Sequence, residues 1–383
     1  MDELIKNYEK KFFWRKITDF WSKFIIYIKT HKKLSIIIGA IIIILVAVGL
    51  GLFFTLRDKP EAPKPEAEKT ATPEAVAVGY PAILDGISTD QSSSLRHPLA
   101  IIVENHPDAR PQAGLDKASI IYEAIAEGGI TRFLALFGTY QAEKVGPVRS
   151  ARTYYVDWAL GYNAYLGHVG GNIDALDKIK ADKVYDLDQF AYSAPYWREG
   201  SGVASEHTAF TSTSKLWDKA TELGYPTANN FNVYKFKEEP EGADRLALPE
   251  KQKITIDFSN TSYKVVFEYD KVTNSYKRYL AGTAHVDRVT KNQLSPKNVI
   301  VMTVKRKSTV TKINESGYDM TNIGTGAAHI FIDGKETIGT WKKNSKTERE
   351  LFYDASGAEV VFDRGQTWIS VLNGETGQSL TVE

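Results

Sequence analysis

The sequence contains no cysteine among its 383 residues. This absence excludes disulfide bonds, thiol nucleophiles, thiolate metal sites and a lipid-modified cysteine. A strong charge of one sign is also missing, because the net charge is +1, whereas a nucleic-acid binder normally carries a basic face. We therefore expect no nucleic-acid partner. Without disulfides the folded part must depend on its apolar core, for which a hydrophobic content of 43% is sufficient.

Charged side chains are absent from residues 34–56, a run of 23 residues. At a rise of about 1.5 Å per residue, a helix of this length crosses the bilayer's hydrocarbon core of about 30 Å. Residues 1–33 carry nine Lys and Arg against four Asp and Glu, whereas the two signs balance after the run. Because positive flanks stay cytoplasmic, we predict a single-pass plasma-membrane protein whose C-terminal part is extracytoplasmic. The lipid bilayer is then a partner through residues 34–56.

A cleaved signal peptide is the competing interpretation of this run. Its apolar core is usually only about 7–15 residues long and ends in a small-residue cleavage site. Residues 51–56 show no such site, and the run is longer than that. An uncleaved signal-anchor is therefore the prediction.

The segments on either side of the run have different compositions. In residues 1–33, apolar and aromatic side chains recur at multiples of four between Lys and Arg, which suits a basic amphipathic helix in the cytoplasmic headgroup layer. A plain flank whose charges only prevent translocation is the alternative. Residues 57–79 hold four prolines among Ala, Glu, Lys and Thr, a composition typical of an extended linker.

Two folded domains are predicted after the linker. In the first, residues 80–240, strands and helices alternate, which indicates a mixed α/β layer structure. Gly128-Gly129 predicts a hairpin between two apolar runs, and Asn172 and Ser214 are predicted helix N-caps. The expected elements are strands at 99–104, 119–126, 130–137 and 164–169, and helices at 152–162, from 172 and from 214.

The second domain, residues 245–383, is predicted to be mostly β. No stretch in it has a convincing helical period, and Asn-Gly, Asp-Gly and Ser-Gly pairs mark tight turns. The expected strands are 254–258, 263–269, 276–279, 299–305, 329–332 and 360–362. The sequence thus predicts an α+β fold, with a mixed α/β first domain followed by a mostly β second domain.

A set of motifs in both domains resembles the YerB-like lipoprotein family over nearly all of residues 97–375. The motifs are Arg110–Leu115, Tyr122–Ala124, Glu127–Arg132, Gly146–Arg152, His168–Gly171, Tyr196–His207, Tyr276–Arg278, Gly282–Asp287 and Asn298–Val301. The resemblance implies a two-domain, extracytoplasmic bacterial protein of a family whose activity is not established. Lipoprotein members need a lipid-bearing cysteine, and here a predicted membrane helix takes that place.

Charged side chains concentrate in the first domain. Glu123 and Glu127 lie four residues apart in one predicted strand, which places both on the same face. Arginine forks bind phosphate or carboxylate oxygens bidentately, and the backbone N–H groups of Gly170 and Gly171 suit an anion. The candidate ligand-binding residues are Glu123, Glu127, Arg132, Arg149, Arg152, His168 and His207.

Three interpretations of this group are open. The arginines can pair with Glu104, Glu123 and Glu127 in a structural ion-pair network. They can instead bind an anionic ligand, or the two candidate carboxylates can perform acid–base chemistry if they face a cleft. For His207, an exposed loop residue is favoured over a general base or ligand.

Other signatures of chemistry are missing from the sequence. The histidines lack HExxH spacing, and His285-Val-Asp287 has no third ligand nearby. Gly324-Thr-Gly326 lacks the third glycine of a dinucleotide fingerprint, and no G-x-S-x-G elbow surrounds Ser150 or Ser193. The sequence therefore predicts no metal site and no cofactor.

The layout is similar to that of the LytR–CpsA–Psr envelope phosphotransferases, which hold a polyprenyl pyrophosphate with arginines and transfer glycans. This similarity rests on architecture alone. We expect a membrane-anchored cell-envelope protein that binds an anionic or glycan ligand, such as a cell-wall glycan or a phosphorylated lipid. The alternative is a phosphoryl or glycosyl transferase, or a glycan-processing enzyme, at the same groove.

The predicted topology has a direct test. Protease added to intact cells should digest the region after residue 56, because the charge asymmetry places it outside. Immunoblotting with antibodies against the C-terminal part measures its loss. A C-terminal part that survives on intact cells and is cut only after lysis would contradict the predicted orientation.

Overall fold

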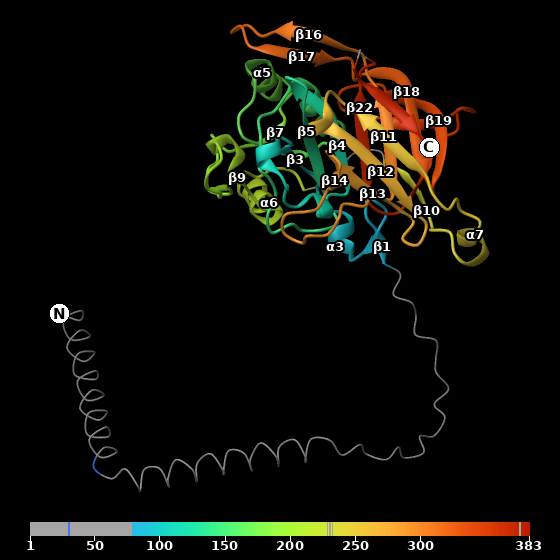
Figure 1. The fold of residues 1–383 in the computed structure, drawn as a ribbon. Helices are drawn as coiled ribbons and strands as arrows, with labels where there is room; N and C mark the ends of the chain where they lie inside the picture. Colours follow the sequence, from blue (N-terminus) through green and yellow to red (C-terminus); the bar gives the residue numbers. More distant parts are fainter. Residues whose placement is uncertain (1–29, 31–78, 228, 230, 232, 375–376) are drawn as a thin grey trace, which may run out of the picture. The chain divides into compact units, whose positions relative to one another are not determined.

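A ten-stranded sheet runs through the folded body and contains strands from both predicted domains (Figure 1). The computed structural model describes residue 30 and residues 79–383, apart from 228, 230, 232, 375 and 376. In order across the sheet, the strands are β20 (Leu351–Asp354), β19 (Lys335–Lys343), β18 (Gly324–Ile332), β15 (Asn298–Thr303), β22 (Thr367–Leu372), β4 (Ile120–Glu127), β5 (Ile130–Phe137), β3 (Leu99–Glu104), β6 (Tyr165–His168) and β7 (Tyr185–Asp188).

The two predicted domains meet in the middle of this sheet. Strand β22, from the second, pairs in parallel with β4 of the first, with Trp368 opposite Ile121. Described residues from 79 onward belong to one compact unit, Val76–Glu383. The boundary at residues 240–245 therefore does not divide the sheet, because strands from both sides of it pair within one sheet.

A second, five-stranded sheet lies beside the first. Its order is β14 (Thr283–Ala284), β13 (Ser275–Leu280), β12 (Lys264–Asp270), β11 (Lys253–Asp257) and β23 (Ser379–Val382). Alternating buried and exposed residues along β12 show that it buries one face. That face packs with odd-numbered residues of β3, β4 and β5 into one apolar core.

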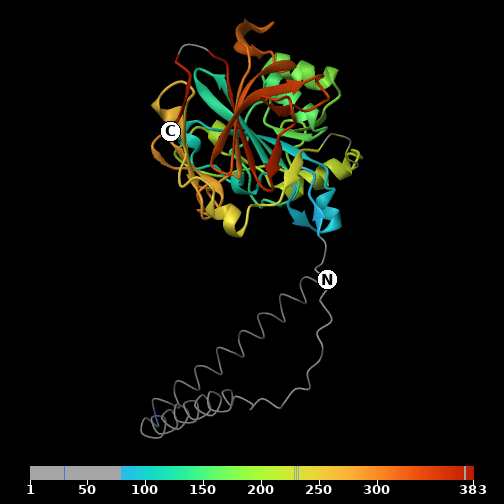
Figure 2. The ribbon, with the colours of Figure 1, turned by 90° about the vertical axis from the view of Figure 1, so that its right-hand side faces the viewer.

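Helices cover the opposite face of the ten-stranded sheet, so the body has three layers (Figure 2). Helices α4 (Thr153–Gly161) and α5 (Ile173–Ala181) pack with even-numbered residues of β3, β4 and β5 into a second core. Helix α6 (Thr213–Glu222) instead contributes Leu216 and Ala220 to the first core.

The remaining elements are short. They are helices α3 (Gln91–Ser94) and α7 (Gly242–Leu246), and 3-10 turns η1 (Pro107–Ala109), η2 (Leu115–Lys117), η3 (Ser205–His207) and η4 (Thr261–Tyr263). Four two-stranded pairings complete the body: β1 (Tyr80–Pro81) with β2 (Ser88–Thr89), β8 (Trp197–Arg198) with β9 (Ala209–Phe210), β10 (Lys235–Lys237) with β21 (Val361–Asp363), and β16 (Arg306–Val310) with β17 (Ser316–Met320).

Most locally predicted elements are confirmed. The strand 99–104 and the hairpin at Gly128-Gly129 are present, and both glycines have positive φ. Asn172 caps α5 by accepting a hydrogen bond from the Ala175 backbone N–H at 3.2 Å. The predicted cap Ser214 is wrong. Ser212 caps α6 instead, because buried Thr213 already bonds to Ala142 and fixes the first turn there.

The mixed α/β character and the mostly β second part are confirmed, whereas membrane anchoring is not shown. The predicted arm at 1–33, except residue 30, the span at 34–56 and the linker at 57–79, except residue 79, lie outside the described residues. Among the residues that are described, no helix has the length and apolar character needed to cross a membrane.

A buried ion pair joins the two sheets. Arg278 of β13 donates from Nη2 to Glu123 Oε2 of β4 at 2.7 Å, and both side chains are fully buried. Trp368 of β22 donates from Nε1 to the same oxygen at 3.2 Å, and its ring lies 4.2 Å from the Arg278 guanidinium carbon. The Glu123 carboxylate thus accepts hydrogen bonds from a guanidinium group of the five-stranded sheet and from an indole N–H of the ten-stranded sheet.

His285 connects this network to Gln112, in the first predicted domain. Arg278 Nη1 donates to His285 Nδ1, so His285 Nε2 carries the ring hydrogen and donates to Gln112 Oε1 at 2.8 Å. Burial, followed by the charges of Arg278 and Arg110, holds the pKa of His285 well below its ordinary value of 6.5. The neutral ring is the form that these hydrogen bonds require.

Removing one member of the Glu123–Arg278 pair should strongly destabilise the protein. Glu123→Gln leaves a buried guanidinium without its counter-charge, which typically costs about 3–5 kcal/mol. The double variant Glu123→Gln/Arg278→Met should lose less than the sum of the single variants Glu123→Gln and Arg278→Met. Urea unfolding of the full-length protein, followed by fluorescence, measures the free energy.

The matched control is the exposed pair of Lys307 and Asp319, whose charged atoms lie 3.1 Å apart. Lys307→Met should change the free energy of unfolding by less than about 1 kcal/mol. A loss in Glu123→Gln no larger than this would refute the structural weight given to the buried pair.

Candidate functional site

Several strands of the large sheet end at one common edge. Strands β3, β4, β6 and β7 run in the same direction, because β3 pairs in parallel with β6, β6 with β7, and both β3 and β4 are antiparallel to β5. Open sheets commonly bind ligands beyond the carboxyl ends of their strands. Glu104, Glu127 and His168 are the last residues of β3, β4 and β6 at this edge.

Two of the predicted arginines share one carboxylate. Arg132 Nη2 lies 2.5 Å from Glu127 Oε1, and Arg152 Nη2 pairs with Glu127 Oε2. Burial would raise the pKa of Glu127, but the charges of Arg132 and Arg152 lower it below its ordinary value of 4.5. The Glu127 side chain is 39% exposed whereas Arg132 is buried, so the shared carboxylate is the part of this group that faces solvent.

The guanidinium group of Arg149 contacts two carboxylates, one buried and one exposed. Its Nε lies 2.5 Å from Oε2 of buried Glu104, while its Nη2 lies 3.2 Å from Oε1 of Glu206, whose side chain is 52% exposed. The Arg149 side chain itself is 21% exposed. We call Glu104, Glu127, Arg132, Arg149, Arg152 and Glu206 the carboxyl-edge cluster.

Every predicted arginine in this cluster therefore has a carboxylate partner, as the ion-pair interpretation expects. Ligand binding by these residues stays a prediction. The structure does bring Arg132, Arg149, Arg152 and Glu127 together, because the charges of Arg132, Arg149 and Arg152 all act on Glu127.

Glu123 does not join them, and the expectation that it shares a face with Glu127 is wrong. A β-bulge shifts the register of β4 between Ile125 and Glu127. The extra residue turns the end of the strand by one position, which exchanges its two faces. Glu123 consequently points to Arg278 and the five-stranded sheet, whereas Glu127 points to Arg132 and helix α4.

His168 is also turned away from the arginines. Its ring is fully buried, with Nδ1 2.7 Å from the Gly170 carbonyl and Nε2 2.8 Å from Asp186 Oδ1. Both ring nitrogens face acceptors, which favours the protonated ring. Burial would lower the pKa of His168, but the hydrogen bond and charge of Asp186 and the charge of Asp188 raise it above 6.5.

The predicted anion site at the backbone of Gly170 and Gly171 is occupied in part by another group of the same chain. The Gly170 backbone N–H donates to Asp188 Oδ1 at 2.8 Å, and its carbonyl accepts from Ala151 N. The expectation that this backbone is open to an external anion is therefore not met at Gly170.

His207 is buried, so the expectation of an exposed loop histidine is wrong. It ends η3, and its Nδ1 lies 3.4 Å from Glu104 Oε2, where it makes no hydrogen bond. The ring stacks on His106, with centroids 4.7 Å apart and planes inclined by 8°. With Asp108, these two histidines place three potential ligand atoms within 4.8 Å of one another.

The linings of five cavities among the described residues do not include Arg132, Arg149 or Arg152. The cavity nearest to them in sequence, of 190 Å³, adjoins the β4–β5 hairpin. It is lined by Ile125, Gly129, Phe258, Ser259, Arg306, Tyr318, Gly377 and Gln378. Hydroxyl, amide, guanidinium and aromatic groups thus lie beside the strand that ends in Glu127.

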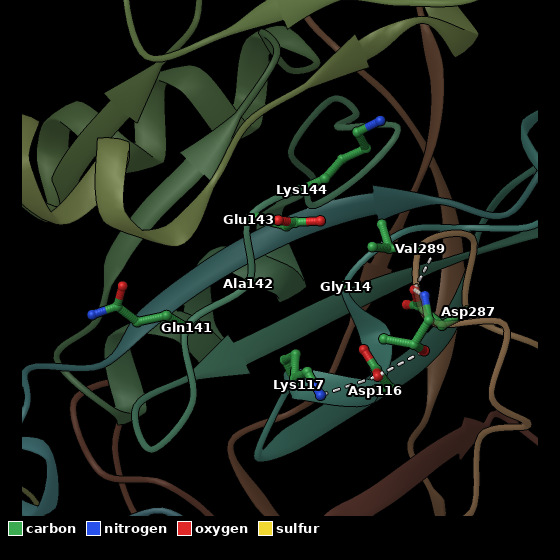
Figure 3. A pocket seen from close by; sticks show the side chains of 10 residues that line it. Gly114, Asp116, Lys117, Gln141, Ala142, Glu143, Lys144, Asp287 and Val289 are labelled. Carbon is green, nitrogen blue, oxygen red and sulfur yellow. Dashed lines mark hydrogen bonds and ion pairs between the residues drawn. The ribbon is translucent and has the colours of Figure 1, made fainter. Parts of the chain in front are cut away.

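A different cavity, of 280 Å³, lies between residues 114–144 and 287–290 (Figure 3). Three of its charged groups have partners. Lys117 pairs with Asp116 at 3.3 Å, Asp116 accepts from Thr290 at 2.9 Å, and Lys144 pairs with Glu199. This site could not be predicted from the sequence because its walls come from segments more than 140 residues apart, and the motifs Arg110–Leu115 and Gly282–Asp287 reach it only at Gly114 and Asp287.

The raised pKa of His168 predicts the sign of a pH effect. Its stabilising contribution is complete below pH 6.5 and disappears as the pH rises through the folded-state pKa. His168→Gln should therefore destabilise the protein more at pH 5.5 than at pH 8, with a change of at most about 1.4 kcal/mol per pH unit. Urea unfolding at the two pH values measures this difference, and a destabilisation that grows with pH would contradict the charged ring.

Comparisons with known proteins identify the family. Residues 84–226 match the model described as "Protein of unknown function (DUF3048) N-terminal domain", and residues 254–369 match the corresponding C-terminal domain. The chain is 29% identical over 308 residues to "Putative lipoprotein YerB" of Bacillus subtilis, covering 80% of this chain and 89% of that protein. The crystal structure of the Bacillus subtilis YerB protein superposes with a TM-score of 0.69 at 28% identity, covering 78% of this chain and 99% of that one. The chain therefore belongs to the family of two-domain YerB-like proteins.

Proposed function

We propose that this protein is a single-pass, membrane-anchored protein of the cell envelope that binds an anionic or glycan ligand at the carboxyl-edge cluster. The anchor is residues 34–56, and the folded body is extracytoplasmic. The name of the Bacillus subtilis relative, "Putative lipoprotein YerB", supports the envelope location. Since this sequence has no cysteine, the uncharged run supplies the attachment that a lipid gives elsewhere.

The observation that carries the proposal is the asymmetric holding of Arg149. Buried Glu104 orients its guanidinium group from one side, which pre-forms the donor geometry for a ligand. On the other side, the partner is exposed Glu206. Exposed ion pairs contribute only about 0–1 kcal/mol, so a phosphate or carboxylate can displace Glu206 at little cost.

Glu127 adds a second place for an anion. Two guanidinium groups share this one carboxylate, so the trio carries an excess positive charge at a partly exposed point. A phosphate has more negative charge and more acceptor oxygens than a carboxylate, and arginine forks match its geometry. The polar cavity beside the hairpin, with Ser259, Gln378 and Tyr318, would contact the uncharged part of a glycan.

The test compares variants that should weaken ligand binding with a variant that should preserve or strengthen it. Arg149→Gln/Arg152→Gln should weaken binding roughly ten- to a hundredfold, because a hydrogen bond to a charged group contributes about 1.5–3 kcal/mol. Glu206→Gln should keep or strengthen binding, since it removes the competing carboxylate. The probes are a labelled polyprenyl-pyrophosphate-linked glycan precursor and isolated cell-wall glycan, and retention on the full-length protein in detergent is measured.

The matched control is Arg364→Gln. Arg364 is also a partly exposed arginine with an exposed partner, Glu238, and it lies near the amino ends of β22 and β4, at the opposite edge of the sheet. It should bind as the unmodified protein does. Equal retention by the double arginine variant would refute the site, and conversion of the labelled precursor would favour the transferase instead of a binding protein.

A further inference from the structure

A second group of side chains at the end of β3 has the composition of a metal site. It consists of His106, Asp108 and His207, which we call the histidine group. Their nearest ligand atoms all lie within 4.8 Å of one another. We propose that the histidine group binds a divalent transition-metal ion such as Zn²⁺. This inference does not depend on the proposed function.

The backbone brings the first two ligands together. Pro107 begins the 3-10 turn η1 directly after β3, and the turn places His106 Nδ1 3.6 Å from Asp108 Oδ2. The third ligand comes from η3, 99 residues after Asp108, whose residue His207 is stacked against His106. Two imidazoles and a carboxylate suit Zn²⁺ and its first-row neighbours better than Mg²⁺ or Ca²⁺, which prefer oxygen ligands.

The state of His207 is the independent observation that points to a ligand. The residue is more than nine-tenths buried, yet its Nδ1 makes no hydrogen bond. Buried polar nitrogens are normally satisfied. Nδ1 faces Glu104 Oε2 at 3.4 Å and Nε2 faces Glu206 Oε1 at 3.8 Å. A metal ion on Nε2 would fix the ring so that Nδ1–H donates to Glu104, the carboxylate–histidine–metal arrangement common around zinc.

Closing the site requires only small movements of flexible side chains. Zn²⁺ bonds to nitrogen and oxygen at about 2.0–2.2 Å, so the three ligand atoms must draw closer together. Asp108 is 61% exposed and His106 is 33% exposed, and the hydrogen bond from Asp108 N to His106 Nδ1 is long, at 3.3 Å. These two side chains can rotate toward buried His207.

The local charges also favour a cation. Asp108, Glu104 and Glu206 place three carboxylates around the histidine group, and Arg149 pairs with two of them, Glu104 and Glu206. Two further arginines near this end of β3 are directed elsewhere. Arg110 is turned to Asn105 and to the ring of Tyr263, and Arg132, opposite Glu104, pairs with Glu127. A divalent ion would offset the remaining negative charge.

Calorimetric titration of the full-length, untagged protein with ZnCl₂ tests the proposal. The protein is first made metal-free, in detergent and in a phosphate-free buffer. One equivalent of Zn²⁺ should bind, and Co²⁺ should acquire a changed visible absorption spectrum as nitrogen ligands replace water. His106→Gln and Asp108→Asn should each weaken Zn²⁺ binding by at least about tenfold.

The matched control is His329→Gln. His329 also pairs with a carboxylate, Glu336, at 2.7 Å and is similarly exposed, so this variant should bind Zn²⁺ as the unmodified protein does. Because His106 and Asp108 are partly exposed, their variants should keep the fold, which circular dichroism checks. Absence of Zn²⁺ and Co²⁺ binding, or unchanged affinity in either variant, would overturn the assignment. Glycan retention is measured separately, so failure of one proposal leaves the other standing.

Discussion

The buried bond between Glu123 and Arg278 determines how the two sheets sit against each other. A carboxylate and a guanidinium taken fully out of water are tolerated only when both are bonded to other groups. Here Trp368, Thr131, Asn105 and His285 supply those bonds. Since the donors and acceptors come from β4, β5, β13, β22 and the residues that follow β3 and β14, a shift of either sheet would leave a buried charge unpaired. The network therefore specifies one packing of the two sheets, while the surrounding apolar residues supply most of the burial energy.

At the carboxyl edge, the same residue types have a different physical role because they are closer to water. Arg132 is buried and contacts the Ser150 carbonyl as well as Glu127, so it is part of the framework. Arg149 and Glu206 are partly exposed, and their contact is screened and weak. Exposure, more than the identity of the partners, distinguishes bonds that hold the fold from bonds that a ligand can replace. The carboxyl-edge cluster combines both kinds within one group.

Patterns among neighbouring residues correctly predicted most helices and strands of the first domain. The apolar run at 99–104, the Gly128-Gly129 turn and the Asn172 cap each depend on a few neighbouring residues. The same patterns could not reveal that β22 inserts beside β4, since that pairing depends on burial of apolar faces far apart in the sequence. They also placed Glu123 and Glu127 on one face, because a single-residue bulge leaves no clear trace in an alternating pattern. The contact between His106 and His207 could not be predicted either, because the two residues are far apart in the sequence. The candidate arginines were found because three of them gather within 21 residues.

The position of β22 has a consequence for how the chain is made. This strand, Thr367–Leu372, lies in the middle of the large sheet between β15 and β4, although it is synthesised long after β4 and after β15. Until it arrives, one edge of β4 and one edge of β15 have unpaired backbone groups, and exposed edges invite pairing with other chains. Pairings so distant in sequence also form slowly. During synthesis, the two parts of the large sheet therefore stay unjoined until β22 has been made, so the order of these strands along the chain sets how long the two edges remain unpaired.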